Sequence, residues 1–374
     1  MTEAVRLLQQ LVSIPSINPR GKALPAEAKM AEAVADWLSK RGIGTEIQEV
    51  LPGRPNVLAR VPGRDRSRTL LLESHLDTVE VDGMIVDPFG GVVKDGRLYG
   101  RGACDDKGPL VAMMLALAAC ANEHPPIDVV LAAAMDEEHQ FKGISHLVAQ
   151  DNKFVAAIVG EPTEMDLIIA HKGVLRFTVA TLGRACHSST PWEGENAIQR
   201  MAAVLDYIRT EMEPAALAKT HPRVGPATWA ATLISGGAAV NTIPETCTIH
   251  LDRRLLPGEE PAGVWAEARA AFLRLIPDRI TVGDPYLLDY ALETDPASPI
   301  VEMLGTAVRR AGFPSTIRGV NYGTDASKTA RAGIPSVVFG PGSIRQAHSA
   351  DEFIEISQVE AAAGILVNLI REIR

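Results

Sequence analysis

The chain has 374 residues, with 37 Lys and Arg against 46 Asp and Glu, which gives a formal net charge of -9. This acidic balance argues against a general nucleic-acid binder and against a protein of anionic membrane surfaces. No apolar run approaches the roughly 18–20 residues that span a bilayer. Residues 1–11 predict an amphipathic helix rather than a signal peptide, so we expect a cytoplasmic protein. The four cysteines form no Cys-x-x-Cys pair, which disfavours a disulfide framework and a thiolate zinc site.

Apolar spacing and turn residues predict alternating strands and helices in the first half of the chain and again near its C-terminus. In chain order we expect a helix at 27–42, strands at 56–63 and 69–76, a buried helix at 108–121, and strands at 127–135 and 154–160. The same pattern resumes with a helix at 298–312, a strand at 334–340 and a helix at 357–373. Strands that alternate with helices are typical of a doubly wound, mostly parallel α/β sheet.

The middle of the chain breaks this alternation. Its expected elements are a strand at 173–183, a helix at 196–212, strands at 228–237 and 245–255, a helix at 261–276 and a strand at 279–285. This β-α-β-β-α-β order is typical of a small ferredoxin-like domain. We therefore predict that residues 173–284 form an inserted domain, and that residues 1–172 and 285–374 form the two parts of the α/β domain.

Three of the predicted strands run directly into histidine or carboxylate residues. His75 and Asp77 follow the first of these strands, Glu137 and Glu138 follow the second, and Glu161 follows the third. In an open α/β sheet, ligands bind outside the carboxyl ends of the strands. We therefore expect these side chains to meet at one edge of the sheet.

Two loops can add further ligands to this edge. The segment GRGACDDKG contains Asp105 and Asp106, and the segment AHSADE contains His348. Any one of these motifs also has an ordinary interpretation, such as acids at a helix N-terminus or a plain turn. The occurrence of all of these motifs together favours a functional site. Two histidines and several carboxylates without thiolates suit zinc, cobalt or manganese ions bridged by a carboxylate.

The motifs SHLDTV, GRGACDDKG, DEE, GEPT and AHSADE occur in the order and rough spacing of the co-catalytic dizinc amidohydrolases. The chain resembles this family over essentially its whole length. The family includes acetylornithine deacetylase, succinyl-diaminopimelate desuccinylase, aminoacylase and glutamate carboxypeptidase. The resemblance implies a zinc-peptidase-like catalytic domain with a ferredoxin-like lid. One departure is Ser74, because many deacetylases and desuccinylases have glycine before the histidine.

The resemblance implies a metal ligand in each motif. His75 and Glu161 would bind the first of two divalent ions, most simply zinc, and Glu138 and His348 would bind the second. Asp105 would bridge both ions, and the family implies a cis peptide bond after it.

The resemblance also implies that Glu137 is the general acid/base. Amide hydrolysis needs a nucleophile at neutral pH, a stabilised oxyanion and a protonated leaving amine. A water between two metal ions would serve as the nucleophile, and a carboxylate that is not a ligand would move its proton. Asp77 lies two residues after His75, and in a strand it would share the same face, so we expect its carboxylate to bond the imidazole.

The inserted domain offers a third group of residues. By resemblance, His187 would contact the scissile carbonyl, often from the partner subunit of a dimer, while Asn241 and Arg254 would bind the substrate. An arginine at that place would hold a carboxylate through its bidentate fork. Segments 323–325 and 340–342 would line the pocket. Without the resemblance, Arg254 would be interpreted as a surface residue.

These observations predict metal-dependent hydrolysis of an amide bond in a small N-acyl amino acid, of the deacetylase or desuccinylase type, by a homodimer that pairs through its lid. A dipeptidase or carboxypeptidase-type exopeptidase is the alternative enzyme. A non-catalytic metal-binding relative is a third hypothesis, and the presence of all five ligands and the base disfavours it.

Overall fold

The structure is a computed structural model that describes residues 1–20, 26–150 and 153–373. It divides into two compact units. The first comprises Met1–Ile169, Thr294–Arg318 and Thr324–Arg374, and the second comprises Ala170–Glu293 and Gly319–Gly323. The second unit continues nine residues beyond the predicted segment 173–284, because β15 (Leu287–Asp289) pairs with β9 (Gly173–Leu182) and so extends its sheet.

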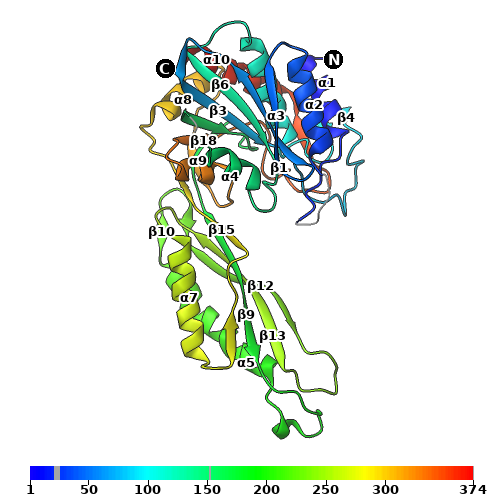
Figure 1. Cartoon of the computed structure of the whole chain (residues 1–374), viewed down its shortest axis with the longest axis vertical. Coiled ribbons are helices and arrows are strands. Elements are labelled where there is room, and N and C mark those ends of the chain that lie inside the picture. Colours follow the sequence, from blue (N-terminus) through cyan, green and yellow to red (C-terminus); the bar gives the residue numbers. More distant parts are fainter. Residues whose placement is uncertain (21–25, 151–152, 374) are drawn as a thin grey trace. The chain divides into compact units, whose positions relative to one another are not determined.

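The first unit is built on a mixed sheet with a parallel centre (Figure 1). Across the sheet the strands are β1 (Gly44–Leu51), β2 (Arg54–Val61), β6 (Ile127–Ala134), β3 (Asp65–His75), β7 (Phe154–Val159), β18 (Ser336–Val338) and β8 (Leu167–His171). Strands β6, β3, β7 and β18 run parallel, whereas β1, β2 and β8 run antiparallel to their neighbours. Every residue of β6 is buried, which explains why its sequence is a continuous apolar run with only Asp128 interrupting it.

Helices cover both faces of this sheet, which confirms the predicted α/β class. The main core lies between one face and α1 (Glu3–Val12), α2 (Ala28–Ser39), α3 (Lys107–Cys120), α8 (Pro299–Arg310) and α10 (Ile356–Glu372). Two short helices, α4 (Lys142–Val148) and α9 (Ala326–Arg331), pack together on the other face. Helix α3 is apolar all round and is buried as predicted. Burial of each of its leucines contributes about 1.5–3 kcal/mol.

The register of the parallel strands brings their ends to one level. His75 lies opposite Ala134, so β6 ends directly beside His75. Glu73 lies opposite Val159, and Val338 of β18 also pairs with Val159. The residues that follow β3, β6 and β7 therefore emerge at one edge of the sheet.

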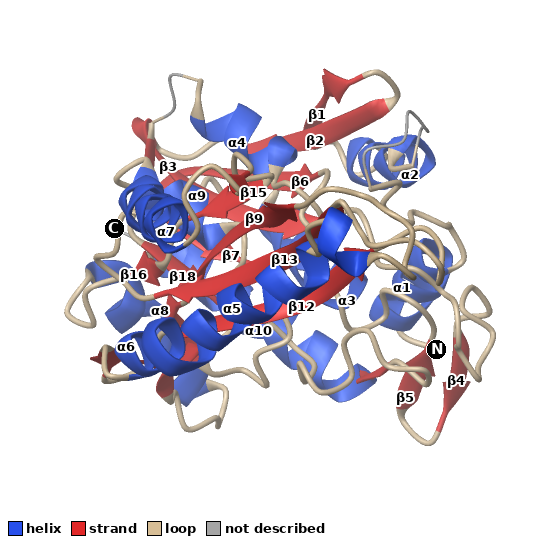
Figure 2. Ribbon diagram, turned by 90° about the horizontal axis from the view of Figure 1, so that it is seen from below, coloured by secondary structure: helices blue, strands red, loops and turns tan. Residues whose placement is uncertain are grey.

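The second unit has a separate antiparallel sheet in the order β12 (Thr228–Gly236), β13 (Thr246–Leu255), β9 and β14 (Ile280–Val282). Helices α5 (Ala197–Tyr207) and α7 (Pro261–Leu275) share one apolar core with this sheet (Figure 2). The chain order of these elements is the β-α-β-β-α-β order that the sequence predicts. In β13, Ile249 and Leu251 are fully buried, as the alternation of apolar residues indicates.

Shorter elements complete the two units. They are β4 (Val92–Lys94), β5 (Arg97–Tyr99), β10 (Thr220–His221), β11 (Gly225–Pro226), β16 (Leu292–Glu293), β17 (Ile317–Val320), β19 (Phe353–Glu355), α6 (Glu213–Leu217), a π-helical turn (Ile208–Met212) and a 3-10 turn (Pro191–Glu193). In the described part of the chain, no helix combines the length and the apolar character that crossing a membrane requires.

Candidate metal centre

A single carboxylate stands between two histidines at the edge of the first unit's sheet. Asp105 precedes α3, and its Oδ1 lies 3.0 Å from Nε2 of His75, at the end of β3. Its Oδ2 lies 3.3 Å from Nε2 of His348, in the loop between β18 and β19. The two oxygens of one carboxylate therefore face two different imidazoles, which is the arrangement of a bridging ligand.

The other predicted carboxylates converge on the same place. Glu138, in the turn after β6, has its Oε1 3.0 Å from Nε2 of His348. One candidate metal-binding group joins His75, Asp105 and Glu138, and a second joins His75, Glu137 and Glu161, with ligand atoms within 4.8 Å of one another in each group. The structure thus brings together the five residues expected as metal ligands and Glu137.

The role expected for the Asp77 carboxylate is different in the structure. The Nδ1 atom of His75 bonds the backbone carbonyl oxygen of Asp77 at 2.9 Å, while the carboxylate lies 3.7 Å away. Strand β3 ends at His75, so the two-residue periodicity does not extend to Asp77. The carboxylate instead accepts the backbone N–H groups of Glu137 and Glu138, each at 3.1 Å. Asp77 therefore fixes the turn that carries both glutamates.

The loop that carries Asp105 is held by buried polar contacts. The peptide bond between Asp105 and Asp106 is cis, as the family resemblance implied. Ser74 Oγ donates to the Asp106 carboxylate, so the serine at this unusual position has a partner. Glu352 accepts the backbone N–H groups of Cys104 and Asp105 at 2.9 and 3.1 Å.

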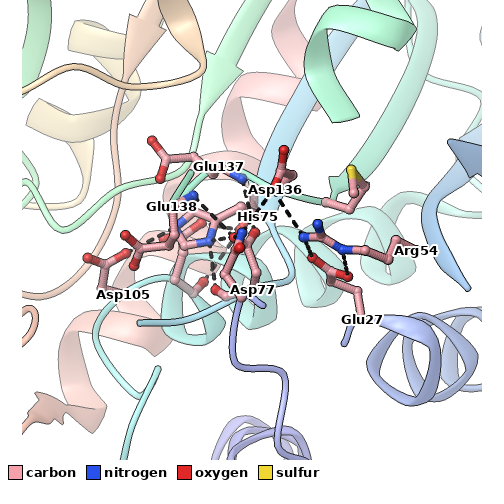
Figure 3. A network of polar contacts seen from close by, with 12 residues as sticks. Glu27, Arg54, His75, Asp77, Asp105, Asp136, Glu137 and Glu138 are labelled. Carbon is pink, nitrogen blue, oxygen red and sulfur yellow. Dashed lines mark hydrogen bonds and ion pairs between the residues drawn. The ribbon is translucent and has the colours of Figure 1, made fainter. Parts of the chain in front are cut away.

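A further buried network lies behind the turn and was not expected from the sequence (Figure 3). Asn18 donates from Nδ2 to Asp77 at 2.7 Å and to Asp136 at 3.0 Å. Arg54 donates to Asp136 at 3.1 Å and forms a two-point ion pair with Glu27. These residues come from distant parts of the chain, so no local motif marks them.

The electrostatics of the site favour a bound cation. Burial raises the pKa values of Glu137 and Glu161 well above the ordinary value, and neighbouring carboxylates raise them further. Burial also raises the pKa of Glu138, although the hydrogen bond with His348 opposes this. Hydrogen bonds with Asp105 and Glu138 raise the pKa of His348 to about 10. A cation bound here would therefore stabilise the charged forms of these buried carboxylates.

The donor set fits two divalent metal ions. All of its donors are imidazole nitrogens or carboxylate oxygens, which suit zinc, cobalt or manganese. The Cys104 thiol lies in the same loop as Asp105, but it donates to the Ser343 carbonyl at 3.4 Å. The bridging geometry of Asp105 and the concentration of buried acids both favour a dinuclear site.

The three other predicted site residues lie in the second unit. His187 is exposed in the loop after β9, and its Nδ1 lies 2.7 Å from Ser189 Oγ. The loop of Asn241 is joined to it, because the Ser188 N–H donates to the Asn241 carbonyl at 2.9 Å. Arg254, in β13, donates from Nε to Asp252 at 2.9 Å.

Comparison with known proteins gives a consistent result. The sequence pattern described as peptidase family M20/M25/M40 matches residues 71–372. The acetylornithine deacetylase of Proteus mirabilis (strain HI4320) is 31% identical over 388 residues, covering 98% of this chain and 95% of the relative. That of Photorhabdus laumondii is 32% identical over 386 residues, with 98% and 96% covered. The solved structure of an M20 family metallo-carboxypeptidase from Sulfolobus solfataricus has the same fold, with a TM-score of 0.82, 19% identity and 99% of each chain covered.

Proposed function

The chain belongs to the M20/M25/M40 peptidase family of enzymes, and from this premise we propose that it hydrolyses the amide bond of a small N-acyl amino acid. The observation that carries this proposal is the Asp105 carboxylate, whose two oxygens face His75 and His348. The names of the Proteus and Photorhabdus relatives favour an N-acyl amino acid as the substrate class.

We assign five ligands to two divalent ions, with zinc the first expectation and cobalt or manganese suitable replacements. His75 and Glu161 bind one ion, Glu138 and His348 bind the other, and Asp105 bridges them. The contact of 3.0 Å between Glu138 and His348 supports their pairing. When bound, such a pair of ions lowers the pKa of a water and polarises the amide carbonyl.

We assign Glu137 as the group that moves the proton. Both glutamates lie close to His75, but Glu138 also contacts His348 and shares a group with Asp105, whereas Glu137 is grouped with Glu161. The Glu137 carboxylate accepts the proton of the attacking water and then delivers it to the leaving amine. Its backbone N–H is fixed by Asp77, which keeps the carboxylate in place during both transfers.

We further propose that the second unit supplies substrate contacts and a dimer interface. His187 and Asn241 lie on joined, exposed loops, and Arg254 holds its guanidinium against Asp252 until a substrate carboxylate competes for it. Strand β12 is an edge of its sheet, with Leu233 and Ile234 63% and 59% exposed. An exposed apolar edge strand is suited to pairing with a second copy of the chain.

A turnover screen tests the proposed activity. N-acetyl, N-succinyl and N-formyl amino acids are offered beside dipeptides, to protein freed of metal by chelation and then loaded with zinc, cobalt or manganese. We expect no turnover without metal and preferential cleavage of one N-acyl class with it. Preferential cleavage of dipeptides would show that the protein is an exopeptidase rather than a deacylase. Full activity in a demonstrably metal-free preparation would overturn the assigned site.

A further inference from the structure

A buried ion pair lies next to the Glu137–Glu138 turn and forms no hydrogen bond with either glutamate side chain. The pair joins Arg54, at the start of β2, to Glu27, which precedes α2, and their side chains are only 5% and 0% exposed. The Arg54 guanidinium reaches Glu27 through Nε and Nη2, and its Nη2 also donates to Asp136. Asp136 is the residue that immediately precedes the two glutamates.

The sheet register explains why Arg54 meets Asp136. Strands β2 and β6 are antiparallel, with Val57 opposite Ala133. Continuing this register by three residues places Arg54 opposite Asp136, just beyond the end of β6. The backbone of Asp136 has a φ of 70°, in the left-handed region that aspartate enters more readily than most residues other than glycine. Its carbonyl accepts the N–H groups of Gln140 and Phe141 within the turn, and the contacts of its side chain with Arg54 and Asn18 add support from outside the turn.

Asn18 links the ion pair to the second support of the turn. Its amide nitrogen donates to Oδ1 of Asp136 and to Oδ2 of Asp77. Asp77 in turn accepts the backbone N–H groups of Glu137 and Glu138. Through Asn18, a continuous path of hydrogen bonds therefore leads from Arg54 to the backbone of both glutamates. Figure 3 labels the two ends of this path and Asp136 and Asp77 between them.

Stability alone is a poor explanation for this arrangement. A buried ion pair commonly gives no more stability than well-packed apolar side chains of the same volume. What an ion pair adds is direction, because the arginine fork fixes its partners in a defined plane. Here the arginine fork orients one carboxylate oxygen of Asp136, the residue that precedes the two glutamates.

We propose that Arg54, clamped by Glu27, is a positioning residue that sets the Glu137–Glu138 turn through Asp136 and Asn18. This inference rests on the proposed function, in which Glu138 is a metal ligand and Glu137 moves the proton. Its consequence is that loss of the Arg54 fork loosens the turn, weakens the metal site that contains Glu138 and lowers kcat more than it changes KM.

The chain offers a matched control on the same strand. Arg60 of β2 donates to Asp128, near the start of β6, at 2.9 Å, whereas Arg54 donates to Asp136, just past the end of β6. The Arg60 side chain is 57% exposed and its pair lies at the other end of β6 from the turn. Arg60→Met therefore removes an arginine–aspartate contact between the same two elements without touching the site.

The experiment compares Arg54→Met, Arg54→Lys and Arg60→Met with the wild type. Amide hydrogen exchange in metal-free protein reports the turn, through peptides covering residues 135–141. Cobalt titration followed by visible absorption reports the affinity of the two metal sites. We expect Arg54→Met to exchange at least about tenfold faster over this segment and to bind its weaker cobalt ion about 10–100-fold less tightly. Arg54→Lys should show smaller changes in both the exchange rate and the cobalt affinity, and Arg60→Met should match the wild type.

Unchanged exchange and unchanged cobalt affinity in folded Arg54→Met protein would overturn the inference. If Arg54→Met does not fold, the double variant Glu27→Gln/Arg54→Met takes its place, because it removes both charges of the pair. Arg54→Lys then gives a second measurement. Equal losses in Arg54→Met and Arg60→Met would also overturn it, because the effect would then be general destabilisation. The exchange measurement uses neither metal nor substrate, so its result stands apart from failure of the proposed function.

Discussion

Glu352 accepts the backbone N–H of Asp105 at 3.1 Å, although 247 residues separate the two in sequence. Glu352 lies four residues after His348, so this contact ties the loop of Asp105 to the loop of His348. The Glu352 side chain is fully buried and pairs with Arg101 at 2.7 Å. The two loops that approach the candidate metal centre from opposite halves of the chain are thus joined to each other by one carboxylate.

Replacing Glu352 should destabilise the protein strongly. Glu352→Ala leaves the buried Arg101 guanidinium without its carboxylate, and breaking a buried pair in this way costs about 3–5 kcal/mol. Guanidinium denaturation measures the loss. Glu355→Ala is the matched control: Glu355 lies three residues after Glu352 and pairs with Arg97, and both side chains of that pair are more than a third exposed. We expect a much smaller loss for that exposed pair. Equal losses in the two variants would contradict a special role for Glu352.

Replacing Glu137 should separate proton transfer from metal binding. Glu137→Gln keeps the shape of the side chain and removes its basicity, so turnover should fall about 10²–10⁴-fold. Metal analysis should still find two ions per chain, because Glu137 is not an assigned ligand. Glu138→Gln is the companion variant and should lose one ion. A Glu137→Gln protein short of one metal would show that the roles of the two glutamates are exchanged.

Subunit mixing tests the proposed action of His187 across a dimer. His187→Ala should lower kcat and keep the metal content. When it is mixed with Glu137→Gln, one site of each heterodimer carries both defects and the other carries neither. Activity should therefore return to about half of the wild-type value per heterodimer. Verified exchange without recovery, or a strictly monomeric protein in solution, would show that His187 does not serve a partner's site.

The cysteines predict a pH-dependent labelling pattern. All four are free, and burial raises the pKa of Cys120 to about 11. A raised pKa means that the reactive thiolate appears only at higher pH, and at pH 8 about 0.1% of such a thiol is ionised. Iodoacetamide at pH 8 should label half-exposed Cys186 first, and Cys120 should react far more slowly, because its thiol is fully buried as well as little ionised. Mass spectrometry of peptides checks this, with Cys186→Ser as control. Equal rates for Cys120 and Cys186 at pH 8 would contradict the structure.

The sequence predicts those parts of the protein that depend on neighbouring residues. Helix α3 and strand β6 follow from local apolar patterns, and the strand ends that carry His75, Glu137 and Glu161 follow from the polar residues after them. The edge strand β1 was not predicted, because its residues are half exposed and largely polar. Burial alone does not decide this, because the short strand β8 is wholly buried and was not predicted either.

The supports of the site could not be predicted in the same way. Arg54 and Asp136 are 82 residues apart and meet only because β2 and β6 pair in one particular register. Glu352 belongs to a recognised motif, but nothing near it in sequence shows that it accepts the N–H of Asp105. The expectation for Asp77 used the periodicity of a strand, and the strand stops two residues too early. Side chains whose partners come from tertiary pairing leave no local pattern.

The place of β18 in the sheet has a consequence for how the protein is made. This strand lies between β7 and β8, yet about 165 residues separate it from β8 along the chain. On the ribosome, β7 and β8 therefore emerge long before the strand that joins them. The sheet of the first unit stays incomplete until residues 336–338 leave the exit tunnel. The loop that contains His348 emerges directly after them. The second unit is contained almost wholly in residues 170–293 and has all of its sheet strands by then. We therefore expect the second unit to fold first during synthesis and the candidate metal centre to be completed last.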